Sequence, residues 1–298
     1  MLAPWVLKLG AVIRGRGRPV GLALILATVF FGGWYVVWCK VRDDVLSSDE
    51  YWLTARDVEI TPLPEWIHTD IRAQVFRDAS LDGPLLILDE KLTERIANAF
   101  SLHAWVAKVH RVTKHHPARV KVELSYRRPV CMIQVPGGLL PVDVGGVLLP
   151  SSDFSPIEAS RFPRLVGVET APMGPVGTRW GDGRVVGAAE IAAAFGEAWA
   201  PLELDRLEVS NASESPHGEQ YTYELFTRHG TRILWGRAPG SNIPGAAPAA
   251  DKVARLRQYA KEHGSLEGRN GPQQLDVRNP QSMRVSRHED GGETNGLR

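Results

Sequence analysis

The stretch Pro19–Cys39, PVGLALILATVFFGGWYVVWC, contains no charged residue and is rich in Leu, Ile, Val and Phe. As an α-helix rising about 1.5 Å per residue it would be roughly 30 Å long, the thickness of the hydrocarbon core of a bilayer. Trp34, Tyr35 and Trp38 gather near its far end, as aromatic rings do at a membrane–water interface. A cleaved signal peptide would need a shorter apolar region and an A-x-A-like site, and the stretch has neither. We therefore predict a retained transmembrane helix over residues 19–39.

The charges on the two flanks of this helix differ. Residues 1–18 form a basic arm that holds four of the 35 Lys and Arg and none of the 34 Asp and Glu. The other flank, residues 40–54, is a polar connection with a run of acidic residues. Because excess Lys and Arg stays on the cytoplasmic side, we expect the arm inside the cell and the rest of the chain outside the cytoplasm.

Composition limits what the exported part can do. The 298-residue chain has a formal net charge of +1, and without the basic arm it is close to neutral, which argues against a general nucleic-acid binder. Only two cysteines occur, Cys39 at the membrane boundary and Cys131 in an expected strand, so we predict no disulfide framework. The exported length suits two modest domains.

The first of these domains is expected over residues 55–128. Arg119–Arg127 alternates strictly between apolar and polar residues and predicts a half-buried strand. Trp105–Lys114 is also expected as a strand, although its apolar residues recur at every third position. The remaining expected elements are a strand at Arg56–Thr61, a helix at Trp66–Phe76 and a second helix capped by Asp89. The order strand–helix–helix–strand–strand predicts a small sheet covered by two helices.

The second domain is expected over residues 129–286. A meander is predicted from three apolar runs separated by glycine turns: Val130–Val135, Leu139–Val144 and Val147–Leu149. Residues 151–184 are rich in Pro, Gly and Ser and are expected to run over the surface, with a short strand near Arg164–Val168. The other expected elements are helices Val185–Trp199 and Asp251–His263, strands Leu202–Ser210, Tyr221–Arg228 and Thr231–Trp235, and short strands at Gln274–Arg278 and Met283–Ser286. Residues 287–298 are expected to be a disordered tail.

The order of these pieces resembles the FtsQ/DivIB family of bacterial cell-division proteins. The most specific stretch is HPARVKVELSYRRPVCMI (116–133), which is similar to the family's junction between a POTRA domain and a β domain. LLPVDVGGVLLP (139–150), TRILWG (231–236) and LDVR (275–278) also match the family in order and spacing. One departure is Asn279-Pro280, where the family often has an aromatic residue.

The resemblance implies an α+β protein: a single transmembrane helix, a POTRA-like βααββ domain, and a mixed-sheet domain with flanking helices. It implies a non-enzymatic scaffold of the division machinery, in the cytoplasmic membrane at the septum, without cofactor, nucleic acid or small-molecule substrate. The implied partners are other division proteins, including small single-pass coiled-coil proteins of the FtsB/FtsL kind. Since a terminal strand can accept a partner's strand, we expect the contact at six residues, unless they merely close the core. These are Leu275, Asp276, Val277, Arg278, Met283 and Val285.

Other signals in the sequence have plainer explanations. His103, His110, His115 and His116 suggest zinc, but adjacent strand residues face opposite sides and no acidic ligand or Cys pair lies nearby, so no metal site is predicted. The sequence has no G-x-S-x-G, S-x-x-K or P-loop pattern. The basic stripe between residues 108 and 128 could meet an acidic partner or lipid headgroups, or be a solvated strand face. A POTRA-bearing factor of envelope assembly or export, and a membrane-anchored enzyme, remain as alternatives.

Overall fold

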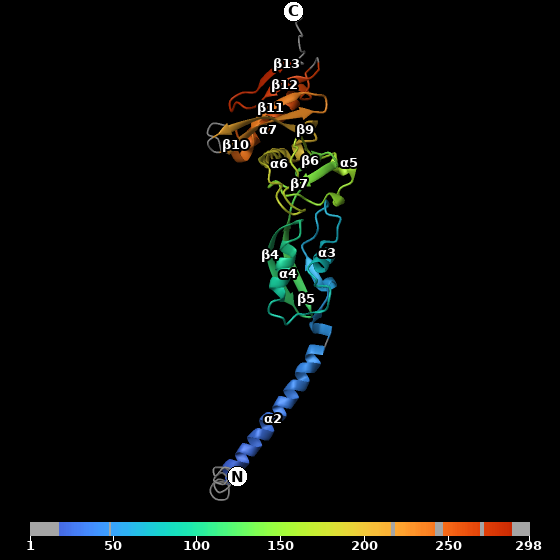
Figure 1. Cartoon of the computed structure of the whole chain (residues 1–298), viewed down its shortest axis with the longest axis vertical. Coiled ribbons are helices and arrows are strands. Elements are labelled where there is room, and N and C mark those ends of the chain that lie inside the picture. The colour runs from blue at the N-terminus through green and yellow to red at the C-terminus, as the bar shows by residue number, and fades with distance from the viewer. Residues whose placement is uncertain (1–17, 48, 216–217, 242–246, 269–270, 288–298) are drawn as a thin grey trace, which may run out of the picture.

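The computed structural model describes residues 18–47, 49–215, 218–241, 247–268 and 271–287 (Figure 1). Its first helix, α2 (Arg18–Ser47), includes the segment Gly21–Arg42, which is long and apolar enough to cross a membrane. The helix continues eight residues beyond the predicted end at Cys39, through part of the expected linker 40–54. Residues 40–47 contain neither Gly nor Pro, so nothing in them stops a helix. The basic arm lies outside the described residues, except that Arg18 begins the helix.

A three-stranded sheet follows, in the order β2-β5-β4. Its strands are β2 (Val58–Ile60), β4 (Val106–His115) and β5 (Arg119–Tyr126). Strand β5 pairs with β2 in parallel and with β4 antiparallel. Helices α3 (Ile71–Asp78) and α4 (Leu92–Ser101) bury their apolar faces in the same core as β5. This is the predicted strand–helix–helix–strand–strand order, with an added two-stranded ribbon of β1 (Trp52–Leu53) and β3 (Leu85–Leu86).

Two expected helix starts are wrong, the first by five residues and the second by two. The helix predicted from Trp66 begins only at Ile71, because the Asp70 carboxylate caps it by accepting from the Ala73 amide at 3.1 Å. The next helix begins at Leu92 without a side-chain cap. The carboxylate of Asp89, the expected cap, instead accepts from the Lys91 amide.

The three-residue apolar period of the second predicted strand has a structural cause. Strand β4 is extended, but its register against β5 shifts between Val106 and Lys108 and again between Val109 and Arg111. Each irregularity places an extra residue on β4 and so displaces the alternation of its side chains. In β5 the alternation is regular, and Val120, Val122 and Leu124 are buried as predicted.

The C-terminal part is built on an eight-stranded mixed sheet, in the order β13-β12-β11-β10-β9-β8-β6-β7. Its strands are β6 (Cys131–Val135), β7 (Gly138–Val142), β8 (Arg164–Val166), β9 (Leu204–Ser215), β10 (Gly218–Thr227), β11 (Arg232–Arg237), β12 (Gln273–Asp276) and β13 (Arg284–Arg287). Residues 147–149, expected as a strand, form only isolated bridges, from Val147 to Arg179 and from Leu148 to Val142.

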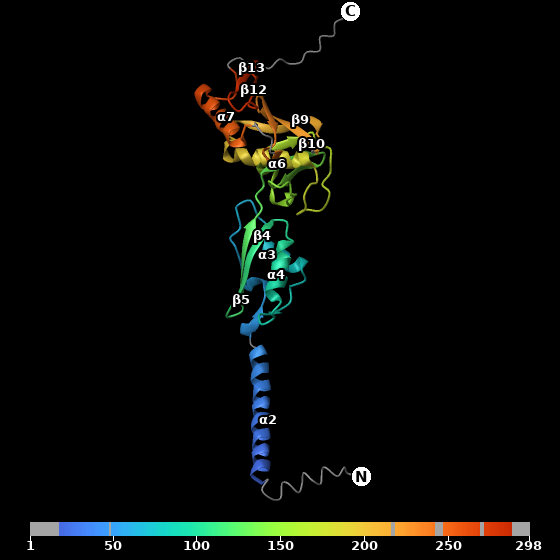
Figure 2. The same cartoon turned by 90° about the vertical axis from the view of Figure 1, so that its left-hand side faces the viewer.

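Helices α6 (Gly183–Phe195) and α7 (Ala249–His263) contribute buried side chains to the core of this sheet. Phe195 packs on Trp235 of β11 with ring centroids 5.2 Å apart. Figures 1 and 2 show α2 at one end of an elongated molecule, the three-stranded sheet in the middle and the eight-stranded sheet at the other end. The shorter helices are α5 (Pro156–Ala159), η1 (Asp49–Tyr51), η2 (Ala55–Asp57), η3 (Ser151–Asp153), η4 (Gly196–Ala198) and η5 (Pro239–Ser241).

The segment 151–184 does not simply run over the surface, as was expected. Its Trp180 is 1% exposed, and η3 joins the two parts of the molecule. The buried Asp153 carboxylate accepts from Trp105 Nε1 at 2.7 Å and from Thr69 Oγ1 at 2.5 Å. Leu149 and Phe154 pack on the core of the three-stranded sheet, although they follow β7 in the chain. Apolar and hydrogen-bonded contacts therefore connect the two cores.

Candidate functional site

The outermost strand at the membrane-distal end of the molecule is β13 (Figures 1 and 2). Strand β12 lies between β11, with which it pairs in parallel, and β13, with which it pairs antiparallel. The strand that carries Leu275 and Asp276, two of the six predicted contact residues, is therefore already paired on both sides. Within the described residues, the outer edge of β13 has no strand beside it. The strand with the unpaired edge, β13, carries Val285, another of the six predicted residues.

The six predicted contact residues have three different environments. Leu275 and Val277 are fully buried in the core, so for these two side chains the alternative of closing the core is what the structure shows. Asp276 and Arg278 form an ion pair with Nη2 and Oδ2 2.7 Å apart, and the hydrogen bond from Arg278 lowers the pKa of Asp276. Met283 packs against the edge of the core, and Val285 on β13 is 49% exposed.

Backbone alternation shows which peptide groups point outward. The N–H groups of Gln273 and Val277 donate to acceptors on or next to β11. Because successive groups alternate along a strand, the peptide groups of Gln274 and Asp276 face β13. Val285 lies between the register partners of these two residues, so its own N–H and C=O point away from β12. Val285 is therefore the β13 residue best placed to offer main-chain hydrogen bonds to another strand.

The turn that leads into β13 is fixed by hydrogen bonds from α7 and by a hydrogen bond within the turn. Arg255 of α7 donates from Nη2 to the Val277 carbonyl at 3.2 Å and from Nη1 to the Asn279 carbonyl at 2.5 Å. The Asn279 side chain accepts from the Gln281 amide at 2.9 Å, the local bond typical of an Asn-initiated turn. Asn279-Pro280, the departure from the family pattern, thus lies in the turn that positions β13.

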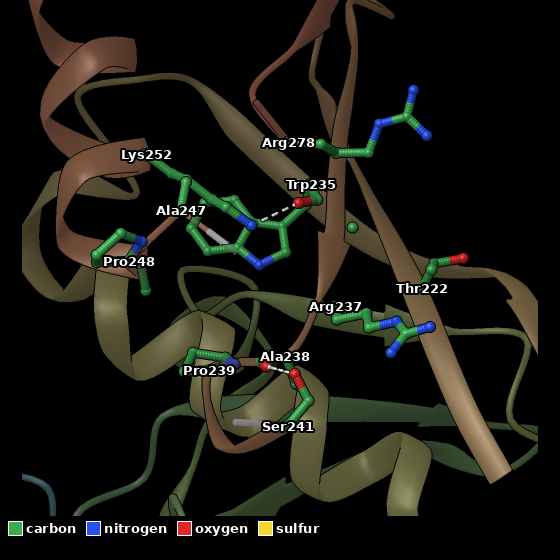
Figure 3. Close-up of a pocket in the computed structure, with 12 residues that line it drawn as sticks. Thr222, Trp235, Arg237, Ala238, Pro239, Ser241, Ala247, Pro248, Lys252 and Arg278 are labelled. Carbon is green, nitrogen blue, oxygen red and sulfur yellow. Dashed lines mark hydrogen bonds between the residues drawn. The ribbon is translucent and has the colours of Figure 1, made fainter. Parts of the chain in front are cut away.

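Sequence reasoning missed a pocket of about 540 Å³ between the end of β11 and the start of α7 (Figure 3). Lys252 reaches from α7 towards Trp235, and its Nζ donates to the Trp235 carbonyl at 2.8 Å and lies 4.8 Å from the centre of the indole ring. The lysine is only 4% exposed. Burial and the nearby Arg255 lower its pKa to about 8. In the sequence Lys252 looks like an ordinary helix-surface lysine, and nothing there signals its burial.

The four histidines that suggested zinc have separate partners. His103 accepts at Nδ1 from the Trp105 amide, and burial lowers its pKa. His110 Nε2 lies 2.6 Å from Ser125 Oγ, His115 Nε2 lies 3.1 Å from Thr113 Oγ1, and His116 lies 3.8 Å from Glu50. The described residues contain no group of three or more potential ligands that could hold a metal ion.

These features define a class of protein: α+β, with an apolar N-terminal helix and a large mixed sheet that, within the described residues, ends in the edge strand β13. No protein-family model matches the chain. It is 29% identical over 240 residues to the cell division protein FtsQ of Anaeromyxobacter sp. (strain K), covering 75% of this chain and 70% of that protein. This similarity confirms the resemblance predicted from the sequence and supports membership of the FtsQ/DivIB family. It supports a cell-division protein held in the inner membrane by a single span.

Proposed function

We propose that the chain is a non-enzymatic scaffold that holds division proteins together at the septum, on the extracytoplasmic side of the membrane. The basic arm would stay in the cytoplasm, and residues 40–54 would connect the span to a POTRA-like domain (55–128) and a β domain (129–286). The similarity to FtsQ and the apolar helix support this assignment. Its partners would include small single-pass coiled-coil proteins of the FtsB/FtsL kind.

The contact surface that we propose is the outer edge of β13. The observation that carries this proposal is an edge strand with an outward-facing peptide group at Val285, fixed in place by β12 and by the turn that Arg255 anchors. An unpaired edge offers main-chain hydrogen bonds to an incoming strand, and exposed side chains such as Val285 add selectivity. Leu275 and Val277 would support this edge from the core, while Asp276, Arg278 and Met283 would flank it.

Replacing Val285 with Pro tests the edge. Proline removes the outward N–H and is tolerated on the solvent side of an edge strand, so the pairing of β13 with β12 should remain. We expect the full-length protein to lose capture of its coiled-coil partner in co-purification and to keep its thermal stability. Val285→Thr keeps the N–H group and should retain capture. Equal capture by Val285→Pro and the wild type would remove this assignment.

Val277→Pro is a poor choice for the same test. Val277 is fully buried and donates its N–H to the Leu234 carbonyl at 3.2 Å, so proline there would damage the sheet itself.

The proposed location at the septum is tested separately, with a fluorescent fusion of the protein in dividing cells. Midcell enrichment before constriction is expected, and a uniform envelope signal would contradict the proposal.

A further inference from the structure

The pocket beside Trp235 holds a buried positive charge that has no carboxylate in direct contact among the described residues, although Asp276 acts on it from a distance. Lys252 is 4% exposed, yet no acidic group of the described chain lies within ion-pair distance of its Nζ. Among the described residues its one hydrogen bond, to the Trp235 carbonyl, leaves two of the three ammonium N–H groups for another acceptor. A buried cation without a partner is costly, and an anion that entered the pocket would offset that cost.

Other groups around the pocket could also donate hydrogen bonds to an anion. Trp235 is fully buried and its Nε1 is a donor without an acceptor within the described residues. Arg237 lies on the rim and forms no ion pair among those residues, whereas Arg278 is already neutralised by Asp276. Figure 3 shows Lys252 and Trp235 at one side of the pocket and Arg237 at another.

The remaining walls limit the size and character of the ligand. They are small: Ala238, Pro239, Ala247 and Pro248 are apolar, and Thr222 and Ser241 carry hydroxyl groups. A buried ammonium with mostly apolar walls beside it matches a charged group on an apolar stem better than a fully hydrated anion.

We propose that this pocket binds a carboxylate of a polypeptide, with the Lys252 ammonium as its main contact and Arg237 at the entrance. The carboxylate belongs to an acidic side chain or to a chain end. Burial lowers the pKa of Lys252, as expected for an ammonium withdrawn from water without a carboxylate in contact. The pocket is separate from the outward face of Val285, so this site does not depend on strand addition at β13.

The test titrates the full-length protein, in detergent micelles, with three small probes. N-acetylglutamate methylamide presents a side-chain carboxylate, N-acetylalanine a terminal carboxylate, and N-acetylglutamine methylamide is the neutral match of the first. Binding is followed through the indole N–H signal of Trp235 in ¹⁵N-tryptophan NMR spectra, assigned with Trp235→Tyr. We expect a saturable shift with one or both carboxylates and binding at least about tenfold weaker with the amide. The stronger of the two carboxylate probes identifies the source.

Variants show whether the carboxylate binds in this pocket or elsewhere on the protein. Lys252→Met should weaken carboxylate binding by about tenfold or more, and Arg237→Gln, which changes only a rim residue, by a smaller factor. Val285→Pro should leave binding unchanged even if it abolishes partner capture. Equal binding of the amide and its matching carboxylate, or wild-type affinity in Lys252→Met, would overturn the proposal.

Discussion

Asp153 and Lys252 are both charged and both almost fully buried, but their surroundings differ. Asp153 accepts hydrogen bonds from Trp105 and Thr69, so its charge is compensated by donors. Lys252 has one carbonyl partner and a lowered pKa. Buried charges with complete partners usually fix a structure, while incompletely partnered ones often mark functional sites. The two residues therefore call for different tests.

For Asp153 we predict a loss of stability on substitution with Asn. The amide can keep both contacts only as neutral hydrogen bonds, with its oxygen towards Trp105 Nε1 and its N–H₂ group towards Thr69 Oγ1. Because hydrogen bonds to a charged acceptor are stronger than neutral ones, the substitution should cost about 1–2 kcal/mol in the free energy of unfolding. Chemical denaturation of the full-length protein measures the loss. Glu158→Gln, in the exposed capping box of α5, is the matched control and should cost less than Asp153→Asn.

For Lys252 we predict a pH dependence of stability. Its pKa is about 8 in the folded protein and 10.5 when unfolded, so between these values the unfolded chain binds more protons and stability rises with pH. Arg255 lowers this pKa and Asp276 raises it, while Arg237 and Arg278 line the same pocket. The rise amounts to at most about 3 kcal/mol. Between pH 7 and 10.5, the free energy of unfolding of the wild type should rise by up to this amount relative to that of Lys252→Met, as measured by chemical denaturation. Parallel pH profiles of the two proteins would contradict the prediction.

At the level of elements, the sequence predicted types better than boundaries. The alternation in β5 is regular because β5 lies between β2 and β4 and must match both neighbours. Strand β4 has a partner on one side only, so it can carry bulges, and these conceal its period. The segment 151–184 was predicted to run over the surface because Pro and Gly are typical of loops. The burial of its Asp153 and Trp180 depends on partners far away in the chain, which the local sequence does not show. The same holds for the site: the presence of β13 was predictable, but its place outside β12 was not.

Helix α6 approaches the sheet closely at Gly187, which gives an element-scale prediction. A Cβ atom at Gly187 would lie 2.2 Å from the Tyr223 hydroxyl oxygen, and Tyr223 is held by a hydrogen bond to the Arg184 carbonyl. Gly187→Ala should therefore destabilise the protein by about 1–3 kcal/mol, although alanine favours helices. Gly183→Ala, whose Cβ would meet Tyr221 at an ordinary 3.4 Å, is the control. Thermal unfolding that ranked the two variants in the opposite order would contradict this packing.

At the scale of the whole molecule, the α2 helix precedes the sheets in the chain. If the arm is cytoplasmic, protease added to intact spheroplasts should digest the sheets and leave a fragment that contains α2. The sheets should be equally sensitive in lysed spheroplasts, which serve as the control. Full protection in intact spheroplasts would invert the orientation and remove the proposed function with it.

The joint made by η3 limits how the molecule can be divided for experiments. A recombinant fragment that stopped at residue 128 would lack Asp153, Leu149 and Phe154. Trp105 would then lose the acceptor of its indole N–H and an aromatic neighbour, and its apolar surface would open to water. Such a fragment should be prone to aggregation. A fragment extended through Phe162, which packs against Phe154, would keep this apolar surface covered.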